Sequence, residues 1–146
     1  MKVAVVYESR TGNTADVAQR IAAACEELGH DIGVWDTKSV NLDFLTAADM
    51  VFLGTWTDGI ILAGHRPGDS GRLLNLPGIW GKPTAGFVTY ALHAGNVIDK
   101  LGDVVHLVGG TWLGGRAFRR DKKSDGLASF VVAALDAAES RTVTSS

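Results

Sequence analysis

Cysteine is almost absent from this chain of 146 residues, in which Cys25 is the only one. One cysteine excludes an internal disulfide and any zinc or iron–sulfur site built from several cysteines. Apolar runs long enough to cross a bilayer are missing as well, and the first residues lack the basic and apolar regions of a signal peptide. We therefore expect a cytoplasmic protein without membrane insertion.

An excess of charge of either sign is also missing. The 14 lysines and arginines nearly balance the 16 aspartates and glutamates, which gives a formal net charge of −2. Proteins that bind nucleic acid usually have a strongly basic surface, so we expect no nucleic-acid partner. No Ser/His/Asp set, carboxylate pair or histidine–carboxylate cluster stands out. We therefore predict no catalytic residue and no metal ligand.

What the chain does contain is an alternation of short apolar strands and amphipathic helices. This pattern predicts an α/β fold in three layers, a doubly wound parallel sheet with helices on both faces. The length fits a single domain over 1–146, of which about 140–146 is expected to be a flexible tail. Strands are predicted over 2–7, 31–35, 50–53, 84–89 and 104–108, and helices over 14–28, 42–48, 96–101 and 124–138.

Three loops, 8–14, 54–72 and 89–96, follow predicted strands. In an open α/β sheet, ligands bind beyond the carboxyl ends of the strands, where these loops lie. All three loops contain unusual residues, whereas the opposite ends of the strands do not. We therefore expect the binding site at this edge of the sheet.

The first loop has the chemistry of an anion site. Ser9, Thr11 and Thr14 supply hydroxyl groups, Gly12 lets the backbone come close to a ligand, and a helix N-terminus follows. The loop has neither a Gly-Lys-Ser/Thr ending nor a Gly-x-Gly-x-x-Gly pattern, so a terminal monophosphate fits better than a triphosphate or dinucleotide. The alternative is an ordinary helix cap in which Asn13 or Thr14 serves only local structure.

The same segment resembles the signature of the flavodoxin family. The matching residues are two aliphatic residues followed by Tyr7, Ser9, Gly12, Thr14, Ala18 and Ile21. In that family this loop binds the phosphate of FMN. The resemblance covers essentially the whole chain in element order and implies a five-stranded parallel sheet with the strand order 2-1-3-4-5. It also implies an FMN-binding flavoprotein that shuttles electrons between a reductase and a redox acceptor.

The other two loops extend the resemblance. Residues 54–59 look like the flavodoxin loop whose tryptophan stacks on the isoalloxazine ring, although Trp56 could instead fold back onto the core. Residues 89–93 match less well, because this chain has Tyr90 but no acidic residue there. Tyr90 could stack on the flavin, or backbone groups of 89–93 could bind its pyrimidine edge. His93 could be a titratable donor or a surface residue without a role.

The FMN contacts that the resemblance implies come from all three loops. They are Ser9, Arg10, Thr11, Gly12, Asn13, Thr14, Thr55, Trp56, Thr57, Asp58, Gly59, Thr89, Tyr90, Ala91, Leu92 and His93.

The charge pattern departs from that of many flavodoxins, which surround the flavin with carboxylates. Segment 114–125 has five basic and two acidic residues, and segment 55–72 is balanced. If these loops line the flavin, nearby cations stabilise the reduced, anionic flavin and make its potential less negative. A protein partner would then be acidic around its redox centre. The alternative is an ordinary solvated run of charges.

Two other functions remain open. An FMN-dependent quinone reductase or a flavodoxin-like protoporphyrinogen oxidase needs room for a substrate over the flavin, and the short third loop and the Gly/Pro-rich segment 59–78 are compatible with that. A binding module without redox activity would hold another phosphorylated ligand or a deazaflavin. Cys25 lies on the apolar stripe of the first helix, so we predict a core residue rather than a reactive thiol.

Overall fold

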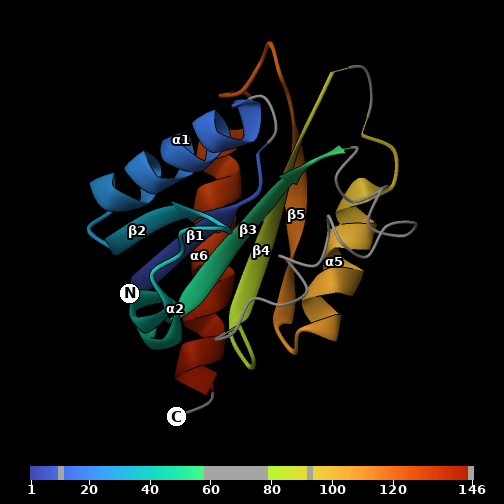
Figure 1. Ribbon diagram of the computed structural model, residues 1–146. Helices are drawn as coiled ribbons and strands as arrows, with labels where there is room; N and C mark the ends of the chain where they lie inside the picture. The colour runs from blue at the N-terminus through green and yellow to red at the C-terminus, as the bar shows by residue number, and fades with distance from the viewer. Residues whose placement is uncertain (10–11, 58–78, 92–93, 145–146) are drawn as a thin grey trace.

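The structure is a computed structural model that describes residues 1–9, 12–57, 79–91 and 94–144 (Figure 1). Its strands are β1 (Lys2–Tyr7), β2 (Asp31–Asp36), β3 (Met50–Trp56), β4 (Pro83–Tyr90) and β5 (Thr111–Arg119). Its helices are α1 (Asn13–Glu27), α2 (Leu42–Ala47), α5 (Val97–Leu107) and α6 (Leu127–Thr144).

The strands form one parallel five-stranded sheet with the order β2-β1-β3-β4-β5. The predicted α/β fold and strand order are therefore confirmed. Because the strands all run in the same direction, their carboxyl ends lie at one edge of the sheet (Figure 1). Near that edge Tyr7 pairs with Gly54, and Trp56 pairs with Thr89. This register brings together chain segments that the sequence separates widely.

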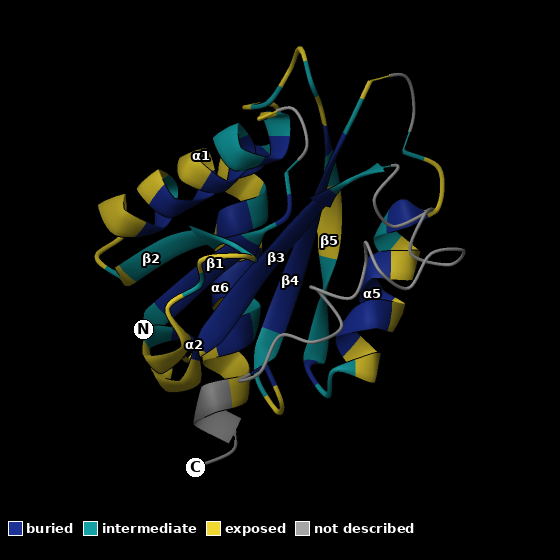
Figure 2. Ribbon diagram, in the orientation of Figure 1, coloured by how far each residue is buried: buried dark blue, intermediate teal, exposed yellow. Residues whose placement is uncertain are grey.

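Helices cover both faces of the sheet, so the central strands are buried on both sides (Figure 2). On one face, Val5 and Phe52 pack with Ile21 of α1 and Val131 of α6. The other face of the sheet packs against α2 and α5. There the strand residues Ala4, Val6, Val51, Leu53 and Val88 cluster with Leu45 of α2 and with Leu101 and Val105 of α5. Burial on both faces explains why the central strands read as continuous apolar runs rather than as alternating patterns.

Helix α1 follows directly from its apolar spacing. Val17, Ile21 and Cys25 recur four residues apart and are fully buried. Burial raises the pKa of the Cys25 thiol to about 11, so the group stays neutral in the core, as predicted. Gly29, just beyond the helix, has a φ of +88°, the left-handed conformation that ends many helices.

The region after β4 departs from the prediction. Helix α5 continues from the predicted helix 96–101 to Leu107, with Val108 as its C-cap residue, so the strand predicted over 104–108 is wrong. Leu101, Val104 and Val105 have helical spacing and are buried together against the sheet. A short valine-rich run does not by itself distinguish a buried strand from the buried face of a helix. The last strand is β5, which begins only after this helix.

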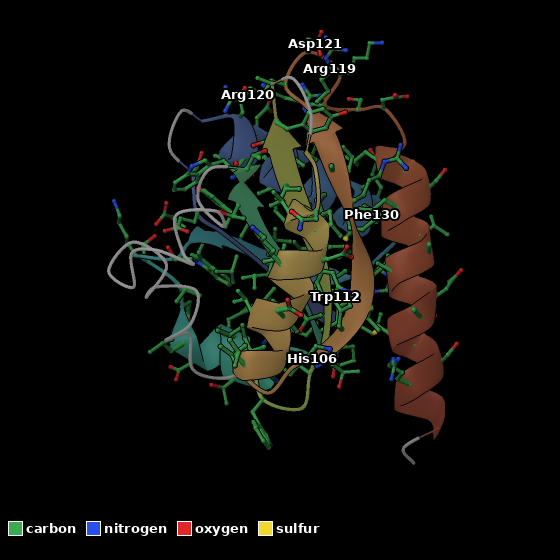
Figure 3. The ribbon with its side chains drawn as sticks, turned by 90° about the vertical axis from the view of Figure 1, so that its right-hand side faces the viewer. His106, Trp112, Arg119, Arg120, Asp121 and Phe130 are labelled. Atoms are coloured by element: carbon green, nitrogen blue, oxygen red, sulfur yellow. The ribbon has the colours of Figure 1, made fainter. Side chains whose placement is uncertain are left out.

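Two facing glycines explain how β5 joins the sheet. Gly86 of β4 pairs with Gly115 of β5, next to an irregularity in the register. A Cβ atom on Gly115 would lie 2.6 Å from the Gly86 carbonyl oxygen, and one on Gly86 would lie 2.5 Å from the Trp112 ring. Glycine at both positions lets the two strands approach closely and leaves room for Trp112 (Figure 3).

The last helix begins slightly later than predicted, at Leu127, and continues to Thr144. Its Phe130 ring packs edge-to-face against Phe52 and Phe118, with ring centroids 5.7 and 5.8 Å apart. These contacts fix α6 on the same face as α1. Helical backbone therefore extends into segment 140–146, whose flexibility stays a prediction.

Candidate functional site

The carboxyl ends of β1, β3 and β4 bring the described parts of the three predicted loops together (Figure 1). The backbone N–H of Glu8, just after β1, donates to the Gly54 carbonyl of β3 at 2.9 Å. The hydroxyl of Thr57, just after β3, donates to the carbonyl of Thr89 near the end of β4 at 2.8 Å. Hydrogen bonds thus connect each loop to its neighbour.

Helix α1 begins at this edge with an unusual cap. Its N-cap residue is Gly12, rather than Asn13 or Thr14, and the Gly12 φ is +91°. The Ser9 Oγ accepts hydrogen bonds from the Gly12 N–H at 3.1 Å and from the Ala15 N–H at 3.4 Å. A serine hydroxyl has two lone pairs and one proton, so accepting both bonds still leaves the O–H of Ser9 to donate.

Thr89 links the first turn of α1 to the end of β4. The hydroxyls of Thr14 and Thr89 lie 2.8 Å apart, and each residue is only 1% exposed. Since Thr57 donates to the Thr89 carbonyl, Thr89 contacts a residue from each of the other two loops. In the hydroxyl pair only one proton is shared, so the other hydroxyl can donate to a further group.

Buried polar atoms without a partner gather at the same edge of the sheet. Among the described residues, these atoms are Thr37 Oγ1, Thr55 Oγ1, Trp56 Nε1 and Arg120 Nε. Thr37 and Arg120 follow β2 and β5, and the other two residues end β3. Buried polar groups are normally hydrogen-bonded, and exceptions commonly mark the place of a water or ligand. Thr55 is the strongest case, because it is fully buried.

The aromatic residues predicted to contact the flavin both lie at this edge. Trp56 is the last residue of β3 and Tyr90 is the last residue of β4, and both are half-buried. The Tyr90 carbonyl accepts a hydrogen bond from the Arg120 N–H at 2.9 Å. Ala91 is exposed just beyond Tyr90. Their contacts with a flavin stay predictions.

Several predicted contacts lie outside the described residues. They are Arg10, Thr11, Asp58, Gly59, Leu92 and His93.

Contacts between charged residues hold the segment after β5 against α1, and sequence analysis did not predict them. Asp16, in the first turn of α1, accepts a hydrogen bond from Lys123 Nζ at 2.9 Å and one from Arg20 Nε at 3.2 Å. These hydrogen bonds, that of Lys123 first, lower the pKa of the Asp16 carboxyl despite some desolvation. Arg20 also donates to Ser124 Oγ at 2.6 Å.

No group of three or more potential metal ligands occurs within the part of the chain that the structure describes. No described helix is both long and apolar enough to cross a membrane.

The comparison with models of protein families identifies the family to which this chain is related. A family model described as "Flavodoxin domain" matches residues 4–96, which is more than half of the chain. The matched region runs from β1 past the end of β4 and so includes the first and third loops and the end of β3. No curated protein sequence gives a significant match.

Solved structures share the fold over nearly their whole length. A flavodoxin from the domain Archaea is 26% identical, with a TM-score of 0.71 over 96% of this chain and 98% of that one. The two-electron reduced flavodoxin of Megasphaera elsdenii is 24% identical, with a TM-score of 0.69 over 90% and 97%. The oxidised Flavodoxin 1 of Bacillus cereus is 23% identical, with a TM-score of 0.72 over 93% and 98%.

Proposed function

The chain belongs to the flavodoxin domain family, and we propose from this premise that it binds FMN non-covalently and transfers electrons between protein partners. The partners would be a reductase that supplies electrons and an acceptor that receives them. The residues at the carboxyl edge of the sheet fit this cofactor in two separate places, one suited to the phosphate and one to the ring.

The N-terminus of α1 is the part that suits the phosphate. A helix N-terminus attracts anions through its dipole and its backbone N–H groups. Ser9 keeps its O–H available because its oxygen already accepts from Gly12 and Ala15. Thr14 can accept from Thr89 while donating its own proton to a phosphate oxygen. Among the described residues, the space above Gly12 is open, since a Cβ there would meet none of their atoms within 4 Å.

The ends of β3 and β4 are the part that suits the isoalloxazine ring. Trp56 offers a flat aromatic face for stacking, and its Nε1–H is buried without a partner in the described structure. Thr55 offers a second unpaired group from the same strand end. Tyr90 lies at the end of the neighbouring strand and can form another wall.

The observation that carries the proposal is this combination of a helix N-terminus with unpaired buried polar atoms at the same sheet edge. An ordinary helix cap would account for Ser9 but not for Thr55 and Trp56. When bound, FMN supplies the redox chemistry by accepting and releasing electrons. The residues of this chain bind the phosphate and orient the ring.

Electron transfer can be tested on the FMN-loaded protein. We expect light-driven reduction of the cofactor under anaerobic conditions, followed by rapid oxidation when ferricyanide, a one-electron acceptor, is added. Reduced nicotinamide nucleotides should not be oxidised by quinones in the presence of the protein. Rapid turnover of those two substrates would instead favour the quinone reductase function. Absence of FMN binding would contradict both functions.

A further inference from the structure

A basic surface adjoins the proposed FMN site. It consists of Arg116, Arg119, Arg120, Lys122 and Lys123, which belong to β5 and to the segment between β5 and α6. Figure 3 shows Arg119, Arg120 and Asp121 together at the end of the molecule where the strands end. The surface is unusual for this chain, whose net charge is −2.

Carboxylates neutralise only part of this surface. Asp121 forms an ion pair with Arg119 at 3.0 Å, and Asp16 forms one with Lys123 at 2.9 Å. Within the described residues, no carboxylate lies at ion-pair distance from Arg116, Arg120 or Lys122. Asp16 is also shared with Arg20, so it compensates even less of the charge. The surface therefore keeps a net positive charge.

A pocket of about 190 Å³ opens within the basic surface. Its charged lining consists of Arg116, Arg119 and Lys122 against a single acidic residue, Asp125. The Arg116 guanidinium lies 5.9 Å from the centre of the Phe118 ring and against Gly126, where a Cβ would collide with it. These neighbours hold one cation of the pocket in place. The pocket has the size and charge to accept a carboxylate side chain.

The pocket and the proposed FMN site have Tyr90 in common. Tyr90 ends β4 beside the predicted ring contacts, and it also lines the pocket. Its carbonyl is hydrogen-bonded to Arg120 of the basic surface at 2.9 Å. A protein that places an acidic group in the pocket would therefore sit next to the edge of the cofactor. A position so close to the cofactor favours electron transfer.

We propose that the basic surface docks an acidic redox protein, with a carboxylate of that partner in the pocket. The redox role of this partner rests on the proposed FMN function. The docking itself does not need the cofactor. Because the molecule as a whole is slightly negative, the local positive surface also orients the approaching partner. Complementary charge increases the association rate and excludes partners of the same sign.

The test uses a plant-type ferredoxin as an acidic probe and cytochrome c as a basic probe of similar size. The isotope-labelled protein is first loaded with FMN, if it binds FMN. Each probe is then added in steps, and the amide chemical shifts of the labelled protein are followed by NMR. We expect ferredoxin to shift resonances of Tyr90 and 116–125, with affinity that falls as salt is added. Cytochrome c should not shift them. Shifts caused only by cytochrome c, or shifts confined to other parts of the molecule, would overturn the proposal.

Two matched pairs of substitutions distinguish the effect of where the charges lie from the effect of the net charge on ferredoxin binding. Arg119→Glu with Lys122→Glu should weaken ferredoxin binding at low salt by at least ~10-fold. The control, Lys100→Glu with Arg141→Glu, changes the net charge equally on α5 and α6 and should weaken binding less than ~2-fold. Equal losses in both pairs would overturn the proposal, as would tighter binding of a DNA duplex than of ferredoxin.

Neither Arg119 nor Lys122 is a predicted FMN contact, so the Arg119→Glu, Lys122→Glu variant should weaken FMN binding much less than it weakens ferredoxin binding. Loss of ferredoxin binding with FMN binding largely retained would support the docking surface specifically. If the unmodified protein binds ferredoxin but not FMN, the proposed function fails and the docking surface stands.

Discussion

Replacing both hydroxyls of the Thr14–Thr89 pair should separate the stability of the site from its ability to bind phosphate. The two oxygens lie 2.8 Å apart, and both residues are 1% exposed. Thr89→Val or Thr14→Val alone leaves the remaining hydroxyl buried without its partner. Such an unsatisfied group costs about 1–3 kcal/mol, a large share of the stability of a small domain.

The double variant Thr14→Val, Thr89→Val should be more stable than either single variant. Replacing both partners by apolar groups of the same shape removes the unsatisfied group, and the change can be nearly neutral. Its FMN affinity should nevertheless fall by ~10-fold or more, because a hydrogen bond to a charged phosphate contributes about 1.5–3 kcal/mol. Riboflavin, which has no phosphate, should bind the double variant and the unmodified protein equally.

Urea denaturation of the protein without ligand measures the four unfolding free energies, and fluorescence titration measures the two affinities. Thr89→Ser is the control that keeps the hydroxyl and should retain FMN affinity. Additive losses of stability in the double variant would refute the buried pair. Unchanged FMN affinity in the double variant would refute the role of Thr14 at the phosphate.

Three further predictions follow from charges and burial. Hydrogen bonds from Lys123 and, to a smaller extent, from Arg20 lower the pKa of Asp16. These two ion pairs therefore stabilise the fold above the ordinary carboxyl pKa of about 3.9, and this stabilisation is lost as the pH falls through the lowered pKa. Acid titration of stability should therefore be steeper below about pH 4 for the unmodified protein than for Asp16→Asn, and identical curves would contradict the ion pairs. Cys25, whose pKa is raised to about 11, should react with iodoacetamide at neutral pH only after denaturation, and fast labelling of the folded protein would show that it is not buried. The fully reduced flavin should form at a less negative potential than in strongly acidic flavodoxins, because nearby cations stabilise its negative charge. Arg119→Glu with Lys122→Glu should make this potential more negative. A spectroelectrochemical titration that finds no such shift would show that the basic surface does not act on the flavin.

The first half of the fold could be predicted from the sequence because its signals are local. The apolar strand, the turn around Gly12 and the stripe of α1 follow one another without interruption, and each element has its own period. The error at 104–108 arose where such signals are weak. Valine-rich segments suit a strand or a buried helix face equally, and only packing of Val104 and Val105 against the sheet distinguishes them.

The connections within the site could not be predicted from the sequence because they depend on strand register. Thr14 and Thr89 are separated by 75 positions and meet only because β1 and β4 both flank β3. Asp16 and Lys123 are separated by 107 positions and meet because the segment after β5 crosses to α1. The basic run itself was visible in the sequence, but its neighbours were not.

The most direct test of an FMN site at this edge of the sheet is a titration of the purified, ligand-free protein with FMN and with riboflavin, followed by tryptophan fluorescence. We expect tight quenching by FMN and much weaker quenching by riboflavin, because the proposed phosphate contacts at α1 and ring contacts at Trp56 act together. A Trp56→Leu variant should lose most of the quenching. Equal, weak responses to both ligands would contradict an FMN site at this edge of the sheet.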